Sequence, residues 1–182
     1  MNSKTLSVRP PSGIDEKKWC ATRWFAVYTR SRHEKVAERE LHKKGIDTFL
    51  PLRKIVRQWS DRKKTIEEPL FKGYLFVRAA LSERFNVLNA VGVVRFVTQG
   101  AEPAEIPEKE LLAIRRFTEE DIQVDPFPYL KQGERVYVRS GPFKGAEGFV
   151  VRKDNHCRLV ISLDMLMQSV SVLIDQACVE PV

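Results

Sequence analysis

The first two thirds of the chain alternate apolar runs with amphipathic stretches. Runs of aromatic and β-branched side chains fit a pleated, half-buried surface and predict strands, whereas apolar side chains recurring every three to four residues predict helices. The predicted strands span residues 24–28, 47–57 (interrupted at Pro51), 65–70, 73–79 and 93–98. The predicted helices span residues 32–44, 82–89 and 108–117. Ser31 and Glu34 have the spacing of a capping box for the first helix, and Gly45 ends it.

These elements follow the order strand, helix, strand, strand, helix, strand, and then one extra helix. That order predicts a ferredoxin-like α/β sandwich over residues 23–117, with a polar, charged hairpin tip at residues 58–64. Residues 1–22 contain Pro10, Pro11 and Gly13 among scattered charges, so we expect them to form a disordered tail.

The last third of the chain has a different pattern. Residues 118–131 contain four acidic side chains together with Pro126 and Pro128, which predicts a semi-extended linker. Short apolar strands with turns between them then predict a five-stranded SH3-like barrel over residues 132–182. These strands span residues 135–139, 146–152, 157–163, 168–174 and 177–180. Between the first two, the segment GPFKGAEG at 141–148 makes a tight turn, with Phe143 available to the core.

The net charge of +7 is concentrated in one part of the chain. Residues 30–64 contain twelve basic and five acidic side chains, which accounts for the whole excess, whereas residues 131–182 carry a net charge of only +1. A concentrated basic face favours a polyanionic partner, because phosphate contacts release counterions. The alternative is a face that is merely solvated.

Several classes of protein lack support in the sequence. The three cysteines, at positions 20, 157 and 178, form no CxxC pair, and the three histidines have no metal-ligand spacing, so we expect no metal site. No nucleophile elbow or phosphate-binding glycine loop is present, and we expect neither enzymatic activity nor a cofactor. No apolar run approaches the ~20 residues of a membrane span, and the N-terminus lacks a signal-like core, so we expect a cytoplasmic protein.

The segment PLFKGYLFV at 69–77 contains the strongest candidate binding residues. Side chains alternate along a strand, so Tyr74 and Phe76 share one face while Leu75 and Val77 occupy the other. If the helices cover the second face, the first is an aromatic face without cover, as expected of an interaction site. The alternative is that both faces are buried.

Taken together, the run WFAVY at 24–28, the basic helix, PLFKGYLFV and the barrel sequence GERVYV followed by GPFKG resemble the NusG family of transcription elongation factors from residue 23 to residue 182. The PLFxxYLFV form is more similar to specialised antiterminators of the RfaH type than to housekeeping members. The resemblance implies an N-terminal NGN domain that docks on the clamp helices of the RNA polymerase largest subunit, and a C-terminal KOW domain that recruits a second factor.

The resemblance also implies roles for particular residues. Tyr28, Phe71, Tyr74 and Phe76 match the polymerase-binding aromatics. Non-template or upstream DNA is expected to contact a basic set with one aromatic: Arg30, Lys43, Lys44, Trp59, Arg62, Lys63 and Lys64. Rho or a small-subunit ribosomal protein is expected at the barrel loop that contains Met165, Leu166 and Met167.

Each of these roles has a simpler alternative. Trp59 and the two methionines can pack in the protein, and the lysines can be solvated. Residues Ser82–Asn86 stand in the place of the stretch with which RfaH touches the opposite side of the polymerase cleft, so the resemblance does not imply that contact here. The β-branched strands favour a barrel that does not refold into helices.

We expect a monomer. The rival functions are a housekeeping factor that couples polymerase to Rho or the ribosome, and, from another class, an RNA-binding or ribosome-associated KOW protein.

Overall fold

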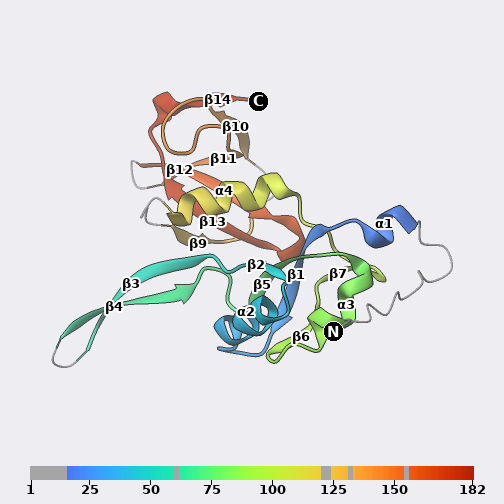
Figure 1. The fold of residues 1–182 in the computed structure, drawn as a ribbon. Coiled ribbons are helices and arrows are strands. Elements are labelled where there is room, and N and C mark those ends of the chain that lie inside the picture. Colours follow the sequence, from blue (N-terminus) through green and yellow to red (C-terminus); the bar gives the residue numbers. More distant parts are fainter. Residues whose placement is uncertain (1–15, 60–61, 120–123, 131–132, 154–155) are drawn as a thin grey trace.

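The computed structural model describes residues 16–59, 62–119, 124–130, 133–153 and 156–182. An N-terminal α/β unit and a C-terminal barrel lie on either side of one helix, α4 (Glu108–Glu119) (Figure 1). The barrel therefore packs on the N-terminal unit through this helix.

The N-terminal unit is built on a four-stranded antiparallel sheet with the order β2-β5-β1-β6. Its strands are β1 (Arg23–Thr29), β2 (Asp47–Phe49), β5 (Tyr74–Ala79) and β6 (Val93–Phe96). Helix α2 (Glu34–Lys43) connects the first two strands, and η1 (Leu81–Glu83) and α3 (Arg84–Leu88) connect the last two. This order and connectivity confirm the ferredoxin-like sandwich.

One face of the sheet packs against α2 and α3. Leu75 and Val77 of β5 join Ala37 and Leu41 of α2 in one buried cluster, and Val87 of α3 belongs to it. The alternation of β5 is therefore the predicted one, with Leu75 and Val77 turned toward the helices.

Helix α2 begins differently from the prediction. It starts at Glu34 after His33, without a side-chain cap, so the expected capping box at Ser31 is wrong. Arg32 has a φ of 61°, which turns the chain just before the helix. The buried carboxylate of Glu34 instead accepts a 2.8 Å hydrogen bond from the backbone N–H of Gly73, so it joins the helix to the turn before β5.

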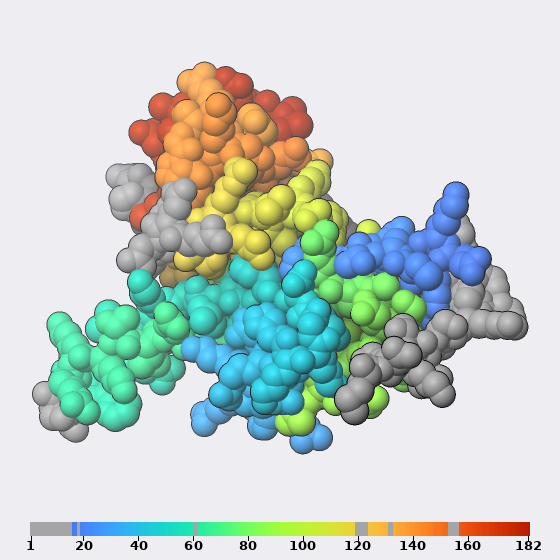
Figure 2. Space-filling model, viewed as in Figure 1, coloured from blue at the N-terminus to red at the C-terminus, as the bar shows by residue number. Residues whose placement is uncertain are grey.

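Strands β3 (Leu52–Gln58) and β4 (Lys63–Pro69) form a separate two-stranded hairpin. The hairpin projects from the body of the molecule as an arm (Figures 1 and 2). A second small ladder pairs β7 (Thr98–Gln99) with β8 (Glu102–Pro103).

The described part of the expected N-terminal tail is helical. Helix α1 (Glu16–Cys20) places Trp19 in the core, where its side chain is only 2% exposed. The guanidinium carbon of Arg84 lies 4.8 Å from the centre of the Trp19 ring, so a cation–π contact ties α1 to α3. The prediction of disorder through residue 22 missed this anchor, and residues 1–15 lie outside the described part of the chain.

The C-terminal barrel contains one strand more than predicted. Its sheet has the order β14-β10-β11-β12-β13-β9. The strands are β9 (Asp125–Phe127), β10 (Glu134–Val138), β11 (Glu147–Lys153), β12 (His156–Leu163), β13 (Gln168–Leu173) and β14 (Val179–Pro181), with η2 (Asp164–Leu166) and η3 (Gln176–Cys178) between the later strands. Strand β9 comes from the segment that we expected to be a linker, and it pairs with β13.

The turn at 141–148 joins the barrel to α4. Phe143 is 4% exposed, and its ring meets that of Phe117 edge to face, with centroids 4.6 Å apart. The guanidinium of Arg116 donates to the carbonyl of Lys144. A Cβ on Gly148 would lie 2.5 Å from the carbonyl oxygen of Val160, so the close approach of β11 to β12 requires glycine there.

The Phe117–Phe143 contact should be measurable as a coupling between the two parts of the molecule. A double-mutant cycle with Phe117→Ala and Phe143→Ala should give a coupling of about 1 kcal/mol in chemical unfolding, the usual value for an edge-to-face pair. As a control, Phe117→Ala combined with Leu41→Ala, on the far side of the sheet, should be additive within about 0.5 kcal/mol. Additivity in the Phe117/Phe143 cycle would contradict the contact.

Candidate functional surfaces

The edge of the aromatic face carries an exposed tyrosine pair. Tyr28 of β1 and Tyr74 of β5 are directly opposite in the sheet, and their rings meet edge to face with centroids 5.1 Å apart. Tyr28 is 40% exposed, Tyr74 is half-buried, and the guanidinium of Arg95 lies 5.7 Å from the Tyr28 ring centre. Burial and the neighbouring phenol of Tyr28, opposed by the charge of Arg95, raise the pKa of Tyr74 above its ordinary value.

The rest of the aromatic face is covered, which corrects the expectation of an open surface. Phe71 and Phe76 are 1% and 0% exposed, and they belong to the same cluster as Ile114 and Phe117 of α4. Phe76 stacks on Phe49 with centroids 6.1 Å apart. The extra helix therefore supplies the cover, because the second face of an amphipathic sheet also needs an apolar partner.

The tip of the β3–β4 hairpin brings an aromatic ring and cations together. Trp59 is 50% exposed, and the ammonium of Lys64 lies 5.6 Å from its ring centre. The neighbouring Lys63 and Arg62 are also exposed. An exposed indole flanked by cations offers a stacking surface and phosphate contacts in one place.

The acidic residues of the described part of the hairpin, Glu67 and Glu68, lie at its base. Glu68 accepts hydrogen bonds from Arg53 and also pairs with Lys72, and Glu67 lies 3.7 Å from the ammonium of Lys35. Among the described residues of the hairpin, the carboxylates near the body are therefore paired with cations, and the exposed cations lie at the tip.

The structure separates the predicted basic residues of α2. Arg30 is exposed just before the helix, whereas Lys43 and Lys44 lie at its opposite end, about 15 Å away for ten residues. Lys43 pairs with Glu40 at 2.7 Å, and Lys44 donates to the carbonyl of Asn86 at 2.8 Å. The two lysines therefore lie at the far end of α2 from Arg30, each with a polar partner of its own.

A basic groove of about 900 Å³ lies between the start of α2 and the base of the hairpin. Its charged lining residues are five cations and three carboxylates: Arg30, Arg32, Lys35, Arg57 and Lys72, with Glu34, Glu67 and Glu68. Tyr28 also lines it, so the groove adjoins the tyrosine pair. Among the cations of this groove, only Arg30 was predicted from the sequence as a binding residue. Arg57 and Lys35 are part of the positive charge excess of residues 30–64. The sequence pattern alone does not show that the turn before α2 faces the hairpin.

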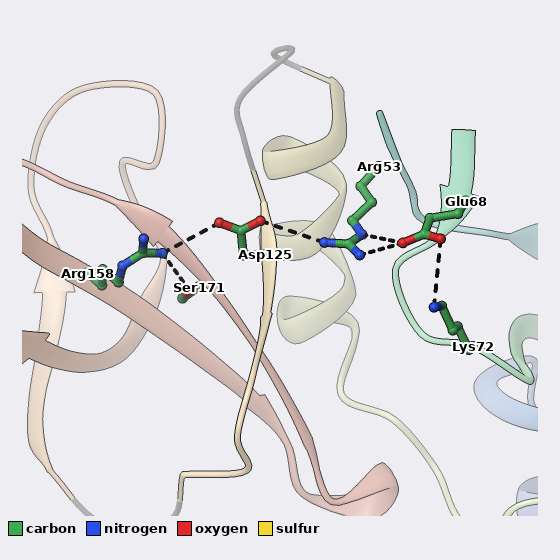
Figure 3. A network of polar contacts seen from close by, with 6 residues as sticks. All are labelled: Arg53, Glu68, Lys72, Asp125, Arg158 and Ser171. Atoms are coloured by element: carbon green, nitrogen blue, oxygen red, sulfur yellow. Dashed lines mark hydrogen bonds and ion pairs between the residues drawn. The ribbon is translucent and has the colours of Figure 1, made fainter. Parts of the chain in front are cut away.

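A polar network connects the hairpin base to the barrel (Figure 3). Asp125 of β9 lies between two guanidiniums, at 3.7 Å from Arg53 of β3 and 3.7 Å from Arg158 of β12. Arg158 also donates to Ser171 of β13 at 3.2 Å. Asp125 is half-exposed, so these pairs orient the two parts more than they stabilise them.

The barrel loop offers one exposed apolar side chain. Met167 is 68% exposed and has a φ of 49°, a left-handed conformation that an L-residue adopts only under constraint. Met165 is half-buried, and Leu166 is 6% exposed within the core. Leu166 is therefore a core residue in this arrangement, and Met167 is the accessible member of the predicted set.

Other kinds of site receive no support from the described residues. They contain no group of three or more histidine, cysteine or acidic side chains arranged to hold a metal ion. No helix among them is long and apolar enough to cross a membrane.

Comparisons with known proteins agree with this architecture. The family model described as "Transcription termination factor nusG" matches residues 22–115. The transcription termination/antitermination protein NusG of Borreliella burgdorferi is 24% identical over 181 residues, covering 87% of this chain and 98% of that protein. The protein of the same name from Staphylococcus aureus is 28% identical over 174 residues, covering 85% of this chain and 93% of the relative.

A solved structure described as "Domain interaction in Thermotoga maritima NusG" is similar in fold. It aligns with a TM-score of 0.53 at 21% identity, covering 89% of this chain and 98% of that one. The fold and these matches define a transcription factor in which a ferredoxin-like unit precedes a small β-barrel. The chain belongs to the NusG family, since the family model spans more than half of it. It is a transcription termination/antitermination factor of the NusG type.

The Glu68 network should make stability depend on pH. The hydrogen bond from Arg53 lowers the pKa of Glu68, so this carboxylate stabilises the folded state at neutral pH and loses its contribution as the pH falls and it is protonated. Glu68→Gln should cost about 1 kcal/mol of unfolding free energy at pH 7 and much less at pH 3. Glu134→Gln, at an exposed position of β10, serves as the control. An equal loss for Glu68→Gln at both pH values would contradict this role.

Proposed function

We propose that this chain binds RNA polymerase at the clamp helices of its largest subunit and suppresses pausing and termination during elongation. The proposal rests on the exposed Tyr28–Tyr74 pair at the edge of an otherwise covered aromatic face. Partly exposed aromatic rings on a rigid sheet are typical anchors of protein interfaces. Phe71 and Phe76 are buried in the cluster against which Tyr74 packs.

The hairpin and the basic groove are the proposed nucleic-acid contacts. Trp59, Arg62, Lys63 and Lys64 at the tip would meet non-template or upstream DNA, and Arg30 in the groove would extend the same positive surface. Because Lys43 and Lys44 are engaged at the other end of α2, we no longer include them in this surface. The coincidence of cations with an exposed ring supports this assignment.

The barrel would recruit a second factor through Met167. Methionine side chains adapt to irregular partner surfaces, and this one is held outward by a constrained turn. Rho or a small-subunit ribosomal protein is the proposed partner.

A second candidate is a general factor that couples polymerase to Rho or the ribosome. The observation in its favour is that the matched NusG relatives align over almost their entire length, barrel included. Transcription in vitro through a pause site and a Rho-dependent terminator separates the two. Faster pause escape with more readthrough supports the antiterminator, and increased Rho-dependent termination supports the general factor. No effect, together with no polymerase binding, would contradict both and favour an RNA-binding role.

The tyrosine pair gives the most direct mutational test of polymerase binding. Tyr74→Ala should weaken polymerase affinity by about 2 kcal/mol, roughly thirtyfold, as expected for an aromatic anchor. Tyr74→Phe keeps the ring and should retain most of the affinity. Affinity is measured by fluorescence titration of labelled protein with core polymerase, after circular dichroism has verified folding. Normal binding by Tyr74→Ala would remove Tyr74 from the interface.

The hairpin tip gives a separate test of nucleic-acid contact. Replacing Lys63 and Lys64 together by alanine should reduce the slope of log affinity against log salt by up to about 0.7 for each single-strand phosphate that is no longer neutralised. The matched control is the double replacement of Lys43 and Lys44, which should leave the slope unchanged. Affinity for a single-stranded oligonucleotide is measured by anisotropy at several salt concentrations. Equal slopes for the wild type and the Lys63/Lys64 variant would contradict the proposed contact.

A further inference from the structure

The first turn of α4 meets the barrel across a polar cavity of about 600 Å³. Lys109 and Glu110 of α4 line one side. The polar groups on the barrel side are Arg135, Glu147, Ser162 and Asp164. This cavity lies in the same interface as the apolar Phe117–Phe143 contact, so one helix presents both an apolar and an ionisable surface to the barrel.

The cations and the carboxylates are unevenly distributed around this cavity. Glu147 lies 3.7 Å from the ammonium of Lys109 and 3.8 Å from a guanidinium nitrogen of Arg135. Asp164 accepts a 3.0 Å hydrogen bond from the Tyr129 hydroxyl, which is an uncharged partner. The two cations thus gather at Glu147, while Glu110 of the helix and Asp164 of the barrel line the same cavity.

Docking therefore brings two carboxyl groups toward each other from different parts of the molecule. Burial, followed by the charge of Asp164 and opposed by that of Lys109, raises the pKa of Glu110 to about 7. A carboxyl group of this kind is least costly to bury when it is neutral.

We propose that docking of the barrel on α4 is coupled to uptake of a proton by Glu110 in the cavity that it shares with Asp164, so that acidification favours the docked arrangement and alkaline pH loosens it. This coupling acts at the interface between the two parts of the chain and does not depend on polymerase binding.

The direction of the pH effect follows from the linkage between proton binding and docking. When the barrel leaves α4, Glu110 loses both its cover and the neighbouring Asp164, and its pKa returns toward the ordinary value of 4.5. Between pH 4.5 and pH 7 the docked form binds the extra proton and is favoured, and this advantage disappears as the pH rises through 7. The docking constant should fall about tenfold between pH 6 and pH 8, because each pH unit in this range is worth up to a factor of about ten.

The protonation step is tested directly by carbon-13 NMR titration of the Glu110 carboxyl in the full chain. We expect a midpoint near neutrality in the wild type. Asp164→Asn keeps an oxygen acceptor for Tyr129 and should move the midpoint toward the ordinary value of 4.5. A wild-type midpoint already at that ordinary value, or one that Asp164→Asn leaves unchanged, would overturn the proposal.

The effect on docking is read by small-angle X-ray scattering in a Phe143→Ala background, where removal of the aromatic ring takes away the Phe117–Phe143 contact and weakens docking. The radius of gyration should increase between pH 6 and pH 8. Adding Glu110→Gln, a permanently neutral carboxyl mimic, should keep the compact radius at both pH values. Adding Glu108→Gln, on the exposed part of the same turn, should preserve the pH response. A radius independent of pH, or a response that survives Glu110→Gln, would overturn the proposal.

Discussion

The structure depends on how the second face of the N-terminal sheet is buried. Helices α2 and α3 cover one face, as in any ferredoxin-like sandwich, and the opposite face carries Phe76 and its aromatic neighbours. Water is a poor environment for that much aromatic surface, so it needs an apolar partner. Helix α4 provides that partner and at the same time gives the barrel a surface on which to pack. The relative position of the two parts is thus a consequence of covering the sheet.

This arrangement leaves only selected groups accessible. The Tyr28–Tyr74 pair stays partly open because it lies at the end of the strands, beside the turn that Gly73 and Glu34 hold together. The hairpin carries its positive charge away from the body, since its carboxylates are neutralised at the base. The tyrosine pair and the base of the hairpin border one groove, which suits the proposed contacts with polymerase and nucleic acid.

Much of the fold could be predicted from local patterns. The alternation of Tyr74, Leu75, Phe76 and Val77 correctly assigned the two faces of β5, and the order of the elements predicted the sandwich. The predictions failed where contacts between segments far apart in the sequence determine the structure. Amphipathic periodicity marks α4 as a helix but cannot say which surface it covers, so the burial of Phe71 and Phe76 was missed. The same limit applies to Trp19, whose partner Arg84 is far along the chain, and to β9, which becomes a strand only by pairing with β13.

The Tyr28–Tyr74 pair and the hairpin together form the proposed polymerase-facing side of this factor. Hydrogen exchange of the full chain, with and without a polymerase elongation complex, tests this assignment most directly. We expect strong protection of residues 27–30, 72–75 and the hairpin at 56–66 in the complex, with little change in α3. Protection confined to the barrel, with residues 27–30 and 72–75 exchanging as in the unbound protein, would contradict this assignment.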